Sequence, residues 1–130
     1  MWFRVGETVT LMLYDKRRPA VVLAINWARG TAVVAIGTTM EAHDPRDNRT
    51  CVKAGSVDAR QMSLHHTTCF RSSKIVLCQL DALSKVLSVS NCPRPLFAQL
   101  CAMMPRAVVG VVRTPGVDSR LPPPELGGPR

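Results

Sequence analysis

Two adjacent histidines and the polar residues that flank two apolar segments are the side chains of this sequence best suited to chemistry. His65 and His66 lie in the segment SLHHTTCF, and histidine is the side chain best placed to transfer a proton near neutral pH. Arg18 precedes one apolar segment, and its planar guanidinium can hold two phosphate oxygens. Thr38 and Thr39 end another apolar segment with two hydroxyls. The alternative for each is an ordinary polar side chain at a strand end or in a loop.

The charge of the chain favours a polyanionic partner. Seventeen Lys and Arg oppose nine Asp and Glu, for a net charge of +8 and a pI near 10.0. RNA, DNA, an acidic protein and an anionic membrane surface all fit such a charge. Residues 45–74 hold six basic side chains against two acidic ones, which fits a phosphate track, although any one of them alone is most simply solvated. The RNA-contact candidates are Lys16, Arg17, Thr39, Lys53, Arg60, Arg71 and Lys74.

The cysteines give no sign of a metal site or of a disulfide framework. Their number is odd, and no two of them have C-x-x-C spacing. We therefore expect five free thiols in a reducing cytoplasm, with no metal and no cofactor. There is no N-terminal signal peptide and no apolar run of roughly 20 residues, so we expect no membrane association. The cysteines are Cys51, Cys69, Cys78, Cys92 and Cys101.

Apolar periodicity predicts strands first and helices last. Alternation or a short apolar run bounded by turn residues is typical of strands, and apolar residues three and four apart are typical of helices. This order predicts an α+β fold, a small twisted β-barrel of the SH3-like type capped by C-terminal helices. The expected strands are residues 5–14, 19–25 and 31–37, with weaker candidates at 48–53 and 73–79; a loop is expected at 40–50, and helices at 80–87 and 94–104.

The composition changes at Pro105. Residues 105–130 contain six of the ten prolines and four of the eight glycines. We therefore expect one domain over residues 1–104 and a mobile Pro/Gly-rich tail over residues 105–130. Within the tail, Ala107–Val112 could form one more short strand.

Four segments, taken in order, resemble the PemK/MazF family of toxin–antitoxin endoribonucleases. An Arg-Pro pair opens the apolar segment KRRPAVVLA, and a later strand ends in GTTM, where Gly37 would allow a ligand to approach the backbone. The segment FRSSKIVLCQLDAL is similar to the family's strand-to-helix segment, and CPRPLFAQLCAMM is similar to its closing helix. The resemblance covers roughly residues 4–104.

This resemblance implies a MazF-type barrel that cuts single-stranded RNA without a metal. In the family the RNA's own 2′-hydroxyl attacks the adjacent phosphate, a step that needs a proton acceptor, a proton donor and positive charge on the phosphate. The family's Arg falls on Arg18 and its Ser or Thr on Thr38. The resemblance also implies a cytoplasmic homodimer and an acidic antitoxin as partner.

The chain departs from the family in its first loop. Many members carry a longer loop there with a Glu proposed as acid or base, whereas YDKRRP is short and offers only Asp15. His65 or His66 is the candidate replacement. The missing Glu also keeps open an alternative, a barrel of the same fold that binds nucleic acid or protein without cutting. A gyrase poison of the CcdB type is disfavoured, because the C-terminal Trp-Gly-Ile character of those toxins is absent.

Overall fold

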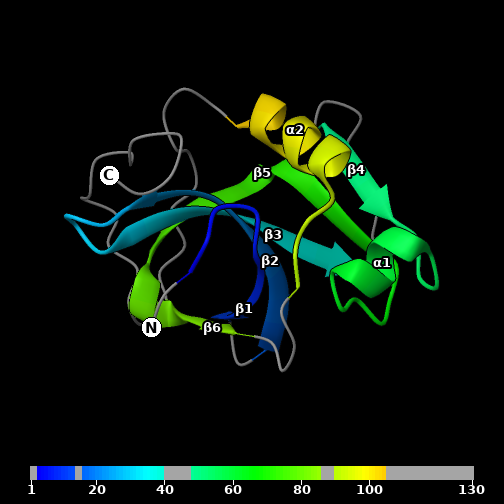
Figure 1. The fold of residues 1–130 in the computed structure, drawn as a ribbon, viewed down its shortest axis with the longest axis horizontal. Helices are drawn as coiled ribbons and strands as arrows, with labels where there is room; N and C mark the ends of the chain where they lie inside the picture. Colours follow the sequence, from blue (N-terminus) through cyan, green and yellow to red (C-terminus); the bar gives the residue numbers. More distant parts are fainter. Residues whose placement is uncertain (1–2, 14–15, 40–47, 86–89, 105–130) are drawn as a thin grey trace.

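The fold is a strongly curved six-stranded antiparallel sheet with two short helices (Figure 1). The computed structural model describes residues 3–13, 16–39, 48–85 and 90–104. The strands are ordered β4-β5-β3-β2-β1-β6 across the sheet. The β-rich part of the α+β prediction is confirmed.

The first three strands lie where the sequence predicts them, and their apolar runs explain the centre of the sheet. β2 and β3 are buried on both faces, as central strands should be. Their antiparallel neighbours complete the backbone hydrogen bonds on each side. The strands are β1 Thr8–Leu13, β2 Lys16–Asn26, β3 Thr31–Thr39, β4 Arg49–Val52, β5 Thr68–Gln79 and β6 Leu83–Lys85.

Each face of the sheet has its own apolar cluster. The helix-covered face packs against α1 (Val57–Gln61) and α2 (Arg94–Met103), and includes Val21, Phe70 and Leu100. The opposite face includes Val22 and Leu11. Adjacent residues Val21 and Val22 belong to different clusters because successive side chains of a strand point to opposite faces.

The helix predicted over residues 80–87 is wrong. Leu80–Ala82 form a single 3-10 turn, and Leu83–Lys85 form β6. β6 pairs with β1, with Leu83 opposite Leu11, and Leu83 is buried in the cluster on the opposite face. Completing the hydrogen bonds of β1 therefore outweighs the helical spacing of the leucines.

The remaining element predictions are partly confirmed. The helix predicted over 94–104 is α2, with a proline in its first turn as expected and with Leu96 and Leu100 buried. β4 matches the weaker prediction at 48–53, whereas β5 begins at Thr68, well before the predicted residue 73. α1 was not predicted; it is short, and Ser56 caps it by accepting a hydrogen bond from the Ala59 N–H at 3.1 Å.

Several predictions fall outside the described residues. They are the mobile tail at 105–130, the strand at 107–112, Asp15 and most of the loop at 40–50. Across the part of the chain that the structure describes, no helix has the length and apolar character needed to cross a bilayer.

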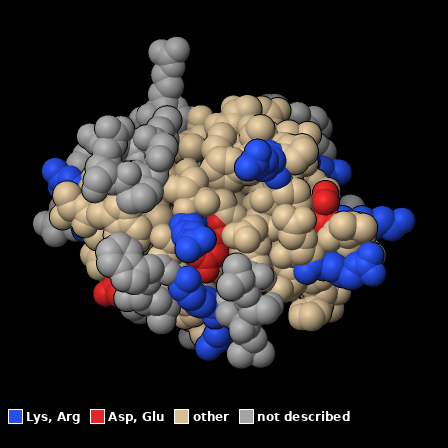
Figure 2. All heavy atoms as spheres, viewed as in Figure 1, with Lys and Arg blue, Asp and Glu red and all other residues tan. Residues whose placement is uncertain are grey.

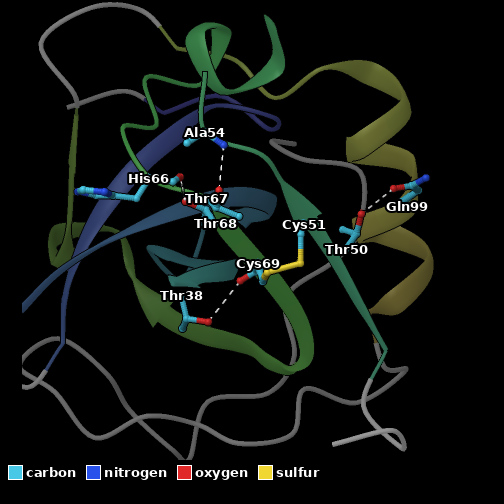
Figure 3. Close-up of a disulfide and its surroundings, with 9 residues drawn as sticks. All are labelled: Thr38, Thr50, Cys51, Ala54, His66, Thr67, Thr68, Cys69 and Gln99. Atoms are coloured by element: carbon cyan, nitrogen blue, oxygen red, sulfur yellow. Dashed lines mark hydrogen bonds between the residues drawn. A yellow bond between two sulfur atoms is a disulfide. The ribbon is translucent and has the colours of Figure 1, made fainter. Parts of the chain in front are cut away.

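The prediction of five free thiols is wrong for two cysteines. Cys51 on β4 and Cys69 on β5 lie opposite each other in the sheet and form a disulfide (Figure 3). They are 18 residues apart, so no local spacing announced the pair, and only the β4–β5 register brings them together. Disulfides are rare in a reducing cytoplasm, so the cysteines give no support to the cytoplasmic prediction. Cys78, Cys92 and Cys101 are free.

Candidate functional site

A pocket of about 260 Å³ collects all four catalytic candidates. Arg18 and Thr38 reach it from β2 and β3, and His65 and His66 reach it from the turn that precedes β5. These residues are up to 48 positions apart in sequence, and the fold brings them to one place. The pocket is lined by Thr8, Val9, Thr10, Arg17, Arg18, Pro19, Gly37, Thr38, Thr39, Met62, Ser63, Leu64, His65, His66 and Thr68.

Arg18 and Thr38 belong to one row of residues that crosses the sheet. The pairing of β2 with β3 ends at Ala20 and Ile36, and Arg18 and Thr38 lie two residues beyond it on the two strands, where both line the pocket. Thr38 in turn pairs with Cys69, and Cys69 with Cys51. We call Arg18, Thr38, Cys69 and Cys51 the disulfide row. Because alternate residues of a strand point to the same face, Arg18 shares a face with Ala20 and Thr38 shares a face with Ile36, and both of these are buried in the cluster on the opposite face.

Thr38 and Arg18 differ in their hydrogen bonding. The Thr38 hydroxyl donates to the Cys69 carbonyl at 3.4 Å (Figure 3). Arg18 is half-buried, and its Nε is buried without a hydrogen-bond partner among the described residues. A buried guanidinium nitrogen that lacks an acceptor is costly, and a bound oxyanion would supply one.

The neighbouring row points to the other, helix-covered face. Arg17 pairs with Met12, Thr39 with Thr68, and Thr68 with Val52. We call Arg17, Thr39, Thr68 and Val52 the threonine row; Arg17 and Thr39 are adjacent in sequence to Arg18 and Thr38. Arg17 and Thr39 are exposed, and both also line the pocket. Both rows therefore border the same pocket from adjacent positions of the same strands.

Backbone and side-chain hydrogen bonds hold the histidine turn. The Thr68 hydroxyl donates to the His66 carbonyl at 2.9 Å, and the Thr67 hydroxyl accepts from the Ala54 N–H at 3.0 Å (Figure 3). His65 and His66 are both exposed, so a substrate can reach their rings. No carboxylate is found among the described residues that line the pocket. An acid or base acting here must therefore come from the histidine pair or from outside the described lining.

Tight packing requires a glycine at position 37, which the sequence pattern did not indicate. A Cβ at this position would overlap the Thr68 methyl group and lie 3.0 Å from the Phe70 ring and 3.2 Å from Pro19. Pro19 and Thr68 thus close over Gly37. The glycine lets three strands pack tightly at the pocket, whereas we expected it to admit a ligand to the backbone.

Five of the predicted RNA contacts lie outside the pocket lining. On the face shown in Figure 2, basic side chains form several separate groups rather than one patch. Arg71 is half-buried on β5, and the other four are exposed on β2, the β4–α1 loop, α1 and β5. The five residues are Lys16, Lys53, Arg60, Arg71 and Lys74.

Neither metal binding nor thiol nucleophilicity is supported at the described residues. They contain no group of three or more His, Cys, Asp or Glu side chains that could hold a metal ion. Burial, with a smaller contribution from Asp81, raises the pKa of the Cys78 thiol to about 12. Burial, with smaller contributions from Asp58 and Cys101, raises the pKa of Cys92 to about 12 as well. Such thiols stay protonated near neutral pH and are poor nucleophiles.

Comparison of the chain with protein-family models, with curated proteins and with solved structures finds no match in any of the three.

Proposed function

We propose that this protein is a metal-independent endoribonuclease that cleaves single-stranded RNA by attack of the 2′-hydroxyl on the adjacent phosphate. The observation that carries the proposal is the gathering of Arg18, Thr38, His65 and His66 around one pocket. Each supplies something that this reaction needs, and no described lining residue is a carboxylate that would repel the phosphate.

In this mechanism Arg18 and Thr38 hold the scissile phosphate. The fork-shaped guanidinium of Arg18 can donate to two phosphate oxygens as negative charge builds up in the transition state. The unpartnered Nε of Arg18 is one such donor. Thr38 lines the same pocket, and its hydroxyl can turn from the Cys69 carbonyl toward a phosphate oxygen.

The histidine pair supplies acid and base. One imidazole takes the proton of the 2′-hydroxyl, and the other protonates the leaving 5′-oxygen. This scheme replaces the Glu found in the first loop of many PemK/MazF members. It uses two imidazoles that are already exposed at the pocket.

The biological role that goes with this activity is that of a type II toxin of the PemK/MazF kind. Three further features go with this role. They are a closed MazF-type barrel, a cytoplasmic homodimer, and an acidic antitoxin that binds this basic chain. The apolar stripe of α2, which is one candidate for the dimer interface, belongs partly to the core. Leu96 and Leu100 are buried, and Phe97, Cys101, Met103 and Met104 pack against the same cluster. Light scattering at micromolar concentration tests the dimer, which a monomer mass would contradict.

An RNA cleavage assay in EDTA tests the enzymatic proposal. We expect cleavage of single-stranded RNA with excess EDTA present, and a 2′,3′-cyclic phosphate or its hydrolysis product at the cut end. A matched substrate with a single 2′-deoxy sugar at the cut site should resist, because its nucleophile is missing. Absence of cleavage by folded protein, together with retained RNA binding, would favour the non-cutting barrel. Cleavage that requires magnesium would exclude the 2′-hydroxyl mechanism.

A further inference from the structure

Two arginines lie directly opposite each other on β4 and β5, outside the pocket lining. Arg49 pairs with Arg71 in the antiparallel register, two residues beyond the Cys51–Cys69 pair on both strands. Like charges placed directly opposite in a sheet repel each other, and the pair is destabilising unless something negative lies nearby. The only ion pair recorded within the described residues, Lys85 with Glu7, is elsewhere.

The side chain of Arg71 has donors without acceptors. Its Nε and Nη2 are buried and have no hydrogen-bond partner among the described residues. Nε and one Nη of a guanidinium form the edge that binds two oxygens of a phosphate or carboxylate at once. Arg49 is exposed on the edge strand β4 and can supply a second positive charge from the strand opposite Arg71.

The disulfide holds these two arginines in place. Cys51 and Cys69 have Cα atoms 4.0 Å apart, and their covalent bond fixes the β4–β5 register. Strands with a fixed register cannot slide to separate the two positive charges. A site that is rigid before binding loses less entropy when it captures an anion.

We propose that Arg49 and Arg71 bind a backbone phosphate of the RNA strand whose scissile phosphate lies at the pocket. This inference rests on the proposed function and adds a second phosphate site to it. Alternation places Arg71 on the same sheet face as Cys69 and Thr38, the face of the disulfide row. Arg71 follows Cys69, the partner of the pocket residue Thr38, by two positions on β5, about 7 Å along the strand. One RNA strand can therefore contact both sites.

Binding of a non-cleavable oligonucleotide tests this proposal independently of cleavage. The probe is a 2′-O-methylated oligoribonucleotide of mixed sequence, followed by fluorescence anisotropy across a salt series. For Arg71→Gln we expect the Kd to rise about tenfold, and the slope of log K against log salt to fall by about 0.7, the value for one phosphate contact on a single strand. Arg29→Gln is the matched control, since it removes the same charge from an exposed position in the β2–β3 turn.

A second arm uses inorganic phosphate alone. We expect phosphate to raise the Tm of the wild-type protein above its value in chloride at equal ionic strength, and to lose most of this effect in Arg71→Gln. If Arg71→Gln does not fold, Arg49→Gln takes its place, because Arg49 is exposed and its substitution leaves the core intact.

The possible outcomes separate this inference from the proposed function. A Kd and salt slope for Arg71→Gln equal to those of Arg29→Gln would overturn the second site, even if the wild type cleaves RNA. Weaker oligonucleotide binding by Arg71→Gln in a protein that never cleaves would support the second site and count against the nuclease. A phosphate effect on Tm without any effect on oligonucleotide affinity would identify a site for free phosphate only and would overturn the RNA contact.

Discussion

The disulfide row and the threonine row run side by side across the same strands, yet they face opposite sides of the sheet. Arg18 in the first is half-buried, whereas Arg17 in the second is exposed. The two arginines are adjacent in sequence and chemically identical. Their difference shows that in a strand the parity of a position decides whether an arginine is half-buried or exposed.

The difference in burial changes how strongly each arginine can interact with a phosphate. A half-buried guanidinium acts on a phosphate through a lower dielectric and with less freedom than an exposed one, so each of its hydrogen bonds counts for more. An exposed arginine adds mainly to the long-range field, which salt screens. We therefore expect the disulfide row to act on the reacting phosphate and the threonine row to assist binding.

The largest effect is expected at the turn that both rows border. Replacing both histidines, His65→Ala with His66→Ala, should lower the single-turnover cleavage rate by roughly 10²- to 10⁴-fold. Affinity for a 2′-O-methylated oligonucleotide should stay within a few fold, because neither residue is assigned a phosphate-holding role. An unchanged rate would return both residues to an ordinary polar turn.

The next largest effects on cleavage are expected from single substitutions in the disulfide row, compared with matched substitutions in the threonine row. Arg18→Ala and Thr38→Ala should each lower the cleavage rate, Arg18→Ala by about 10²- to 10³-fold, because Arg18 stabilises transition-state charge. The matched variants Arg17→Ala and Thr39→Ala should cost about tenfold or less and act mainly on Kd. Circular dichroism and Tm check that all four proteins are folded. A larger loss in Arg17→Ala than in Arg18→Ala would move the reacting phosphate to the helix-covered face.

The disulfide ties the first row to the sheet edge, so breaking it should affect stability before activity. A Cys51→Ser/Cys69→Ser protein should lose about 3 kcal/mol of unfolding free energy, the amount expected for a cross-link that closes a loop of this length. Urea unfolding measures the loss, and Cys101→Ser is the control because Cys101 is a free, partly buried thiol. Equal unfolding midpoints for wild-type protein with and without reductant would show that the disulfide does not form in solution.

Gly37 lines the pocket beneath Pro19 and Thr68, and the effect of changing it should be smaller. Gly37→Ala adds a Cβ that meets the Thr68 methyl group and the Phe70 ring, which should cost about 1–3 kcal/mol as in other overpacked sites. Combining it with Thr68→Ser removes the methyl group concerned and should recover part of the loss. A Gly37→Ala protein as stable as the wild type would contradict the tight packing of Pro19 and Thr68 over this residue.

The smallest predicted effect is on alkaline stability. The pKa of Cys78 and of Cys92 is about 12 in the folded chain against 9.0 as a free thiol, so between these values the folded state keeps protons that the unfolded state loses. The contribution of these two thiols to folding stability is therefore fully present below pH 9 and falls as pH rises toward 12. In Tm measurements from pH 8 to 10.5, Cys78→Ala should lose less stability with rising pH than the wild type does. Parallel curves would show that this thiol titrates normally.

Local sequence patterns were enough to predict the β-rich class, the first three strands and the closing helix, and they singled out Arg18, Thr38, His65 and His66 among the residues that line the pocket. These follow from local patterns, since an apolar run bounded by turn residues must be buried and a proline suits a first helical turn. The resemblance to PemK/MazF singled out Arg18 and Thr38, and residue chemistry singled out His65 and His66.

The features that depend on which strands pair, and in which register, were set by the tertiary structure. The spacing of Leu80, Leu83 and Leu87 fits a helix, but β1 needed a partner, so Leu83 became part of a strand. Cys51 and Cys69 show no motif, and the β4–β5 pairing alone makes them a disulfide and places Arg49 opposite Arg71. Pairing between distant strands is set by the sum of many backbone hydrogen bonds and buried contacts, and no short stretch of sequence contains that sum.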